Sequence, residues 1–317
     1  MEKVSVISDK QNVLNIVMSL IVVGLCALAM FGVPSMSSQG PSQIATAGPS
    51  VFSIISIGLA IGCYGTIVGI GGGPLIVPIL VLFYGWDNEI LVATSLFIVF
   101  LNALSGSVGY ARQKRIEYKG AIKFSLAAIP GALLSAFIHH TFDIKAFDLM
   151  FGIFLIFLAV YSLVSAKKMD REIPKINKKL IEKGHRLVEL KDKFNDKFKF
   201  TVDDGLGIKM NLILGFFVGF LGIGGGVFQV PVLIFLLKYP PHIATATSHF
   251  VTMATCLFAL IPHLFLGNVM FDEALWMGVG IVTGAQLGAY LSPKLNAKLI
   301  VYLFVLILFV FALKMFL

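Results

Sequence analysis

A small set of neutral polar side chains lies inside segments of the chain that are otherwise strongly apolar. Hydroxyl, amide and imidazole groups can hydrogen-bond a small solute without carrying a permanent charge. A single Ser or Thr in an apolar helix usually bonds its own backbone carbonyl, so the repeated Ala-Thr-Ser at 93–95 and 246–248 is the stronger indication. We predict a substrate site that includes Thr94, Ser95, Asn102, Gln229, Thr247, Ser248, His249 and Gln286.

Two glycine clusters of identical sequence, Gly-Ile-Gly-Gly-Gly, interrupt two of the apolar segments. The clusters are Gly69–Gly73 and Gly222–Gly226. Each is followed by an apolar piece of about a dozen residues, which is too short to cross a bilayer upright. Glycine frees the backbone, and a proline directly after the first cluster suits the first turn of a helix. We therefore predict that a helix breaks at each cluster and returns as a half-helix, beginning near Pro74 and Val227.

Backbone released from a helix cannot face lipid, so both breaks are expected to meet at the centre of the molecule. The first amides of each half-helix carry a partial positive charge, which suits an anion. The helices that end at the clusters present carbonyl groups instead, which suit a cation, so the alternative of a coupling Na⁺ stays open. The competing interpretation of the glycines is close helix packing. The predicted anion site includes Gly71, Gly72, Gly73, Gly224, Gly225 and Gly226.

The composition places these residues in a membrane protein. Hydrophobic residues make up 57% of the 317 residues and charged residues 13%, whereas soluble chains are nearer about half apolar and about a quarter charged. The net charge of +8 lies in short blocks beside apolar segments, which is typical of cytoplasmic loops and not of a nucleic-acid surface. The three cysteines form no C-x-x-C pair and predict neither disulfides nor a metal site, and no cofactor is expected.

Seven further apolar runs are long enough to cross a bilayer as helices, which needs about 20 residues. They are Val13–Val33, Ile90–Tyr110, Gly120–Ile138, Ala146–Ser165, Ile243–Phe265, Ala274–Leu291 and Leu299–Phe316. The first run is longer than the apolar core of a signal peptide, about 7–15 residues, which favours a retained anchor helix. The predicted fold is an all-α polytopic membrane protein.

The chain contains two copies of one unit. A shift of 153 positions aligns the glycine clusters, the Ala-Thr-Ser tripeptides, and Pro78 with Pro231, without a gap. Each unit is predicted to hold a broken, re-entrant hairpin followed by three full spans, and an odd number of crossings inverts the second unit relative to the first. The chain then divides into an N-terminal anchor helix and outer loop (1–50), a first unit (51–166), a charged cytoplasmic connector (167–207) and a second unit (208–317).

The distribution of charge agrees with this inversion. The loop between the first two full spans of the first unit carries Arg112, Lys114, Arg115 and Lys119, whereas the matching loop Gly267–Asp272 carries no Lys or Arg. Basic loops usually face the cytoplasm. We therefore predict a multi-pass protein of the cell membrane with its N-terminus inside and its C-terminus outside.

The connector has a pattern of its own. A solvated linker with a helix in it is favoured over an amphipathic helix that lies on the membrane surface or binds a cytoplasmic partner. The apolar residues that recur there at helical spacing are Ile176, Leu180, Leu187, Leu190, Phe194 and Phe198.

Inverted repeats with paired helix breaks are an architecture of secondary transporters. A passive anion channel could use the same cavity. An intramembrane enzyme is disfavoured, because its candidates Ser248 and His249 are adjacent on a helix and point about 100° apart. His249 replaces Leu96 of the first unit, and an imidazole with its ordinary pKa of about 6.5 could couple transport to protons. An interhelical hydrogen bond is the competing role for His249.

The motifs also resemble those of a known family. G-I-G-G-G-P-L-I-V-P in the first unit, and G-I-G-G-G-V-F-Q-V-P, A-T-A-T-S-H-F and T-G-A-Q-L-G-A in the second, are similar to the sulfite exporter TauE/SafE family. The resemblance covers about residues 51–166 and 208–317. It implies a permease that exports small sulfur-containing anions, such as sulfite or organosulfonates, and is driven by the proton gradient.

Overall fold

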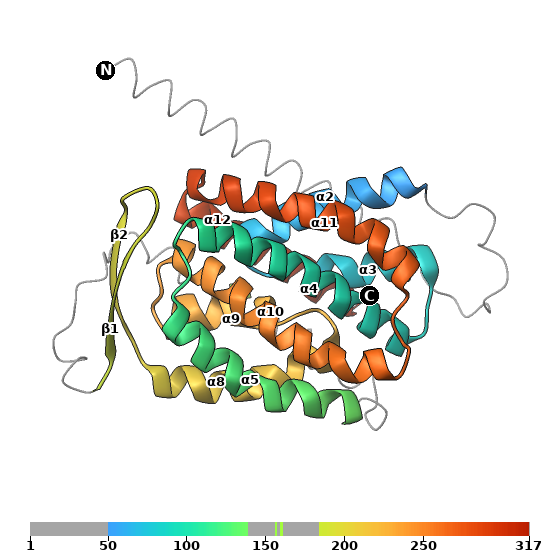
Figure 1. Ribbon diagram of the computed structural model, residues 1–317, viewed down its shortest axis with the longest axis horizontal. Helices are drawn as coiled ribbons and strands as arrows, with labels where there is room; N and C mark the ends of the chain where they lie inside the picture. The colour runs from blue at the N-terminus through green and yellow to red at the C-terminus, as the bar shows by residue number, and fades with distance from the viewer. Residues whose placement is uncertain (1–49, 139–155, 157–158, 161–183, 317) are drawn as a thin grey trace, which may run out of the picture.

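The computed structural model describes residues 50–138, 156, 159–160 and 184–316, and this part of the chain is mostly helical (Figure 1). Four of its helices are long and apolar enough to cross a membrane: Val51–Val68, Glu89–Arg112, Pro241–Phe265 and Phe271–Lys294. The predicted anchor helix at 13–33 and almost all of the predicted span at 146–165 lie outside the described residues.

The first unit begins with a helical hairpin that breaks at its glycines. Helix α2 (Val51–Val68) ends at Gly69, and α3 (Gly73–Tyr84) begins within the same glycine cluster. The 12 residues of α3 extend over about 18 Å, which is little more than half of a bilayer core. Two longer helices follow, α4 (Asn88–Arg112) and α5 (Tyr118–Ile138).

The second unit repeats this order at matching positions. The bounds of α8, α10 and α11 equal those of α2, α4 and α5 after a shift of 153 positions, and α9 with η2 takes the place of α3. A half-helix therefore follows the second glycine cluster as well. The elements are α8 (Asp204–Leu221), α9 (Gly226–Pro231), the π-helical η2 (Val232–Leu236), α10 (Pro241–Phe265), α11 (Phe271–Leu291), the 3₁₀ turn η3 (Ser292–Lys294) and α12 (Ala297–Phe316).

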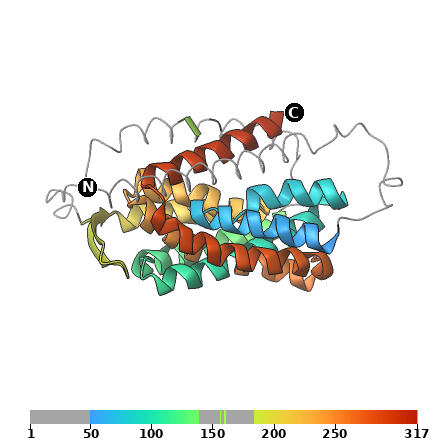
Figure 2. The ribbon, with the colours of Figure 1, turned by 90° about the horizontal axis from the view of Figure 1, so that it is seen from above.

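The two units exchange packing partners. Helix α2 packs along α11, α8 packs along α5, and α4 and α10 lie against each other between these pairs (Figure 1). Glycines permit the close approach, because a Cβ on Gly62 would overlap the backbone of Ile281 and a Cβ on Gly215 would overlap that of Ala128. Helix α12 lies on one face of this arrangement, in contact with α2 and α10 (Figure 2).

The two broken hairpins enter the helical body from opposite ends. In Figure 1, α2 begins at the right end of the body, whereas α8 begins at the left end, beside the two strands. Helices α3 and α9 each turn back toward the end from which the preceding helix came. The matched elements of the two units therefore run in opposite directions.

The described part of the connector is a β-hairpin, so the predicted helix is wrong there and the fold is not purely α-helical. Strand β1 (Arg186–Lys191) pairs antiparallel with β2 (Lys197–Val202). The residues assigned to the helix by their spacing and found in the hairpin are Leu187, Leu190, Phe194 and Phe198. Ile176 and Leu180 lie outside the described residues.

Packing and turn chemistry explain why the hairpin forms. Phe200 and Val202 alternate with polar residues along β2 and are buried, which is the period of a strand. Asp192 Oδ1 accepts hydrogen bonds from the N–H groups of Phe194 and Asp196, each at 2.9 Å, and this closes the turn.

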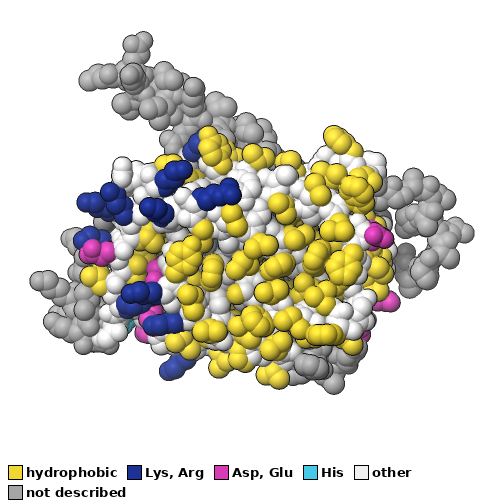
Figure 3. Space-filling model, viewed as in Figure 1, with side chains coloured by type: hydrophobic (Ala, Val, Ile, Leu, Met, Phe, Trp, Pro, Cys, Tyr) yellow, Lys and Arg dark blue, Asp and Glu magenta, His cyan; other side chains and the backbone are white. Residues whose placement is uncertain are grey.

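The face of the molecule seen in Figure 3 carries a broad apolar area with charged residues at its ends. Figure 3 shows hydrophobic side chains over the middle of the visible face, with Lys and Arg gathered toward the end that bears the β-hairpin. A continuous apolar surface of this kind fits contact with lipid. Exposed apolar side chains from α5, α8 and α11 include Leu126, Leu134, Leu212, Ile213, Leu275, Trp276 and Val279.

Candidate functional site

Both helix breaks are made by glycines in the left-handed backbone region. Gly69 ends α2 with a φ of 89°, and Gly222 ends α8 with a φ of 66°. Gly71, Gly72 and Gly224 follow with φ values of 73°, 78° and 75°. Residues with a Cβ rarely adopt this conformation, so the glycines dictate locally where each helix stops.

The two glycine clusters lie in contact, as the sequence predicted. A Cβ on Gly73 would overlap the carbonyl oxygen of Ile223, and a Cβ on Gly226 would overlap the backbone of Ile70. These are equivalent contacts made from the two units. Each half-helix therefore starts against the broken backbone of the other unit.

The serines of the repeated Ala-Thr-Ser hold the breaks in place. Ser95 Oγ donates to the carbonyl oxygen of Gly222 at 2.6 Å, and Ser248 Oγ donates to that of Gly69 at 2.8 Å. Both side chains are fully buried. Each serine satisfies a carbonyl group at the end of a broken helix, across the boundary between the units.

The threonines of the same tripeptides fix the start of the next helix. Thr94 Oγ1 accepts from the N–H of Met270 at 3.1 Å, and Thr247 Oγ1 accepts from the N–H of Glu117 at 3.2 Å. Met270 directly precedes α11, and Glu117 directly precedes α5. The repeated polar residues thus all have partners within the protein, and their predicted contact with substrate stays a prediction.

Buried polar groups near the breaks that have no hydrogen-bond partner among the described residues include Asn102 Nδ2, Gln229 Nε2 and Thr252 Oγ1. Asn102 Nδ2 lies 3.1 Å from the place of a Cβ on Gly72, and Thr252 Oγ1 lies 3.7 Å from that on Gly225. A buried polar group left without a partner costs about 1–3 kcal/mol, so a ligand that bonded these groups would recover that energy.

His249 is fully buried where α2, α4 and α10 meet. Its Nε2 lies 3.3 Å from Thr66 Oγ1, and its ring packs edge-to-face with Tyr110. Gly106 makes room for the imidazole, because a Cβ there would overlap the ring. The interhelical hydrogen bond is therefore present, and a role in proton coupling stays a prediction.

Gln286 is a residue of α11 and lies against the C-terminal half of α4. Its Nε2 donates to the carbonyl oxygen of Ser105 at 2.6 Å and to Ser105 Oγ at 2.9 Å. Gln286 therefore links α11 to α4, and the structure shows no contact between it and the glycine clusters among the described residues.

Within the part of the chain that the structure describes, the centre is closed to solvent and carries no fixed charge. None of the described residues that contact the two breaks is Lys or Arg. Gln229 is 2% exposed, and the polar residues of α4 and α10 have no exposed surface: Thr94, Ser95, Asn102, Thr247, Ser248, His249 and Thr252. A solute that bound here would therefore need one end of the protein to open.

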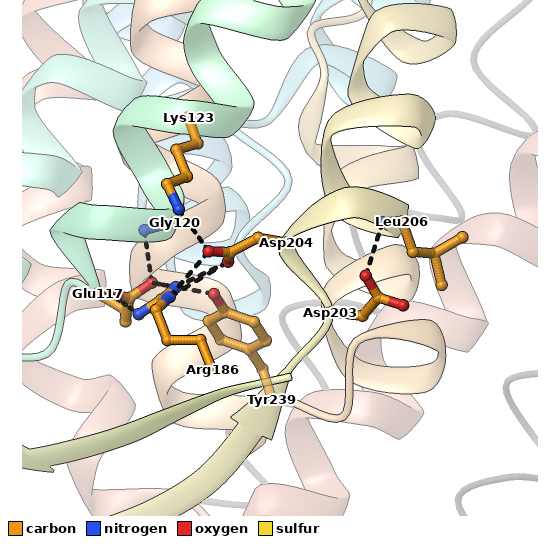
Figure 4. Close-up of polar contacts among 8 residues, drawn as sticks. All are labelled: Glu117, Gly120, Lys123, Arg186, Asp203, Asp204, Leu206 and Tyr239. Carbon is orange, nitrogen blue, oxygen red and sulfur yellow. Dashed lines mark hydrogen bonds and ion pairs between the residues drawn. The ribbon is translucent and has the colours of Figure 1, made fainter. Parts of the chain in front are cut away.

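A charged cluster occupies the end of the molecule that bears the hairpin (Figure 4). Arg186 Nη1 lies 3.0 Å from Glu117 Oε1, and Arg186 Nε lies 3.0 Å from Asp204 Oδ2. Tyr239 Oη donates to Glu117 Oε2 at 3.0 Å, and Lys123 pairs with Asp204. Although burial favours the neutral form, the bonds to Asp204 and Glu117 raise the pKa of the Arg186 guanidinium. The cluster joins β1 to the starts of α5 and α8.

The turn of the hairpin is bonded to the end of α4 and, through Gln113, to that of α11. Arg115 Nη2 lies 2.7 Å from Asp192 Oδ2, and both side chains are almost fully buried. The N–H of Lys193 donates to the carbonyl oxygen of Gln113 at 3.0 Å, and Gln113 Nε2 donates to that of Ala289 at 2.6 Å. This part of the connector thus packs on the chain's own helices, and a cytoplasmic partner or membrane contact for 167–207 stays a prediction.

The predicted substrate site did not include every polar residue near the helix breaks. Thr66 and Thr252 are absent from it. Thr252 differs from Val99 at the matching position of the first unit, and this difference between the units is the signal that points to Thr252. Arg186 and Glu117 are separated by 69 positions, and nothing in the local sequence of either residue points to the other.

Two broken helical hairpins that meet at the centre of an apolar, multi-helix body define a polytopic membrane protein with the architecture of a transporter. The comparison with known families agrees. The chain belongs to the sulfite exporter TauE/SafE family, which matches residues 54–315 and, in a second alignment, residues 4–112. It is therefore a multi-pass membrane transporter of that family and not an enzyme, which confirms the resemblance seen in the motifs.

Curated relatives match most of the chain. YunE of Bacillus subtilis, a probable membrane transporter protein, is 29% identical over 262 residues, which cover 80% of this chain and 93% of YunE. A probable membrane transporter protein of Methanocaldococcus jannaschii is 29% identical over 260 residues, which cover 77% and 87% of the two chains. YjnA of Bacillus subtilis is 27% identical over 271 residues, which cover 83% and 98%. No solved structure gives a significant match.

Proposed function

We propose that this protein is a secondary transporter that exports small sulfur-containing anions, such as sulfite or organosulfonates, and binds the anion between its two helix breaks. The observation that carries the proposal is the meeting of two half-helix starts beside the unpartnered amide groups of Asn102 and Gln229. Backbone and side-chain N–H groups stabilise an oxyanion strongly when they are held away from water. The description of the family supports sulfite as the first candidate substrate.

Among the described residues no Lys or Arg contacts the breaks, and this suits transport. An anion paired with a buried Arg or Lys would leave an uncompensated charge behind whenever it dissociated, at a cost of several kcal/mol. Neutral donors avoid this cost. The anion can therefore leave the site without a charged group having to be satisfied in its place.

We further propose that residues 51–166 and 208–317 are inverted repeats, each with a re-entrant hairpin and three spans, preceded by an anchor helix within 1–50. The matched helix bounds, the exchanged packing partners and the opposite entry of α2 and α8 support this topology. The basic end with the hairpin then faces the cytoplasm, which places the N-terminus inside and the C-terminus outside.

Cysteine labelling tests the topology at three exposed positions, Asp87, Lys119 and Leu266. In a background without the native cysteines, Lys119→Cys should react with a membrane-impermeant maleimide only from the cytoplasmic side. Asp87→Cys and Leu266→Cys should react only from the outside. Reaction of Lys119→Cys and Leu266→Cys from the same face would contradict the inversion.

Flux into proteoliposomes tests the function itself. Purified protein should accumulate sulfite against its gradient when a pH gradient is imposed, whereas a passive anion channel would only dissipate a gradient. Thiosulfate, sulfoacetate, taurine and sulfate complete the substrate panel, and replacement of Na⁺ by another cation tests the alternative coupling ion. Asn102→Ala should reduce uptake at least about tenfold. Thr283→Ala is the control, because the Thr283 hydroxyl bonds only carbonyl groups of its own helix.

A further inference from the structure

Thr66 of α2 holds the amide of Asn102 in a fixed orientation. Thr66 Oγ1 donates to Asn102 Oδ1 at 3.0 Å, and both side chains are fully buried. An amide oxygen accepts hydrogen bonds and does not donate them, so the Thr66 hydroxyl is the donor, and the oxygen end of the amide is the end that meets Thr66. The Nδ2 group is at the other end and has no partner among the described residues.

That Nδ2 group faces the first helix break. It lies 3.1 Å from the place of a Cβ on Gly72 and 3.1 Å from that on Gly65. Neither glycine has a side chain to separate the amide from the backbone at the start of α3. Two N–H donors of one buried amide thus point toward the start of α3, where Pro74 has no N–H group and those of Leu75 and Ile76 bond the carbonyl oxygen of Gly72.

Thr66 is itself held from two sides. Its single hydroxyl hydrogen is used on Asn102, so the contact of 3.3 Å with His249 Nε2 is a hydrogen bond in the tautomer that carries its hydrogen on Nε2. Tyr110 Oη donates to the backbone carbonyl oxygen of Thr66 at 2.7 Å. A hydrogen-bonded series therefore runs from His249 on α10 through Thr66 on α2 to Asn102 on α4, and it ends at the break.

We propose that Thr66 is a positioning residue for the substrate: it keeps the amide hydrogens of Asn102 directed at the bound oxyanion. The inference rests on the proposed function and adds a residue to it. The second unit has no equivalent, because Gly219 stands at the position of Thr66 and Thr255 at that of Asn102. Thr255 Oγ1 donates to the carbonyl oxygen of Val251 in its own helix at 2.7 Å.

Binding of sulfite to the purified full-length protein, measured by calorimetry with sulfate as a second probe, tests the proposal. Thr66→Val removes the hydroxyl at nearly constant shape and should weaken sulfite binding about tenfold. Thr66→Ser keeps the hydroxyl and should bind as the wild type does. Thr255→Val is the matched control, a buried threonine whose hydroxyl bond stays within its own helix, and it should also bind as the wild type does.

A double substitution separates positioning from packing. Because Thr66 acts through Asn102, Thr66→Val should cause no additional loss of affinity in an Asn102→Ala background. If Thr66→Val does not fold, Thr66→Ala gives the same comparison. Unchanged affinity in the single variant, or an equal loss in both backgrounds, would overturn the inference and leave the proposed function in place. Failure of the wild type to bind either anion would overturn both.

Discussion

The two helix breaks share one scaffold and differ in the polar side chains around it. Each has a left-handed glycine at the helix end, a serine that bonds the opposite break, and a threonine that fixes the next helix, all in matching positions. The unmatched pairs include Thr66 with Gly219, Asn102 with Thr255, Val99 with Thr252, Ile76 with Gln229 and Leu96 with His249.

The unpartnered donors near the breaks fall in the unmatched set. Repetition of a polar motif in a duplicated protein therefore indicates a part of the scaffold, because the same structural problem occurs twice and is solved twice. One bound anion, by contrast, needs only one set of ligands. The positions where the two units differ are the better guide to the substrate.

The largest expected effect comes from the glycines at the contact between the two glycine clusters. Gly73→Ala and Gly226→Ala each place a Cβ inside the backbone of the opposite unit, so both proteins should fail to fold. Gly85→Ala is the control, because its Cβ would meet nothing within 4 Å and it adds only the strain of a φ of 59°, about 1–3 kcal/mol. Size-exclusion chromatography of the solubilised protein measures the outcome. A monodisperse Gly73→Ala protein would contradict the close contact between the two glycine clusters.

The next effect distinguishes the two breaks. Gly72 has a φ of 78°, and a Cβ on it would lie 2.8 Å from Ile61 Cγ2, whereas Gly225 has a φ of −73°, which any residue can adopt. Gly72→Ala should therefore lower the free energy of unfolding by about 1–3 kcal/mol more than Gly225→Ala does. Thermal unfolding of the two purified variants measures the difference, and equal losses would show that the breaks are equivalent.

A third prediction separates the scaffold from the ligands of the anion. Ser95→Ala and Ser248→Ala each leave a buried carbonyl without its partner and should each lose about 1–3 kcal/mol of stability, with little change in sulfite affinity once folded. Gln229→Met removes a donor that has no partner, at similar volume, so it should keep the stability and weaken sulfite binding. The opposite pattern would reverse the roles of repeated and unrepeated residues.

The smallest effect concerns protons. His249 faces the neutral side chains of Thr66 and Tyr110, so a proton on its imidazole would place a single positive charge near the breaks. The affinity for the anion should then rise as the pH falls, and His249→Gln should keep binding but lose this dependence. Calorimetry at a series of pH values measures it, with sulfate as the probe because sulfite itself gains a proton near neutral pH. The same pH profile in both proteins would place the coupling group elsewhere.

Local signals in the sequence determined the positions of the helices. Glycine is the residue that adopts the left-handed backbone freely, so the ends of α2 and α8 at Gly69 and Gly222 follow from the residues at those positions. Apolar runs of about 20 residues predicted α4, α5, α10, α11 and α12 to within a few residues, because the thickness of a bilayer sets their length. The duplication fixed which elements correspond.

Long-range contacts decided the rest. The apolar spacing of the connector fits a helix, yet a hairpin forms because Phe200 and Val202 are buried on the protein and Arg186 meets Glu117 and Asp204. The bonds that join Ser95, Thr247 and Asn102 to other elements reach partners 36 to 130 positions away in the chain. A sequence states that such a group is polar. Only the packed structure determines whether its hydrogen bonds are used within the protein or stay free for a ligand, because that depends on which distant groups the fold brings within about 3 Å.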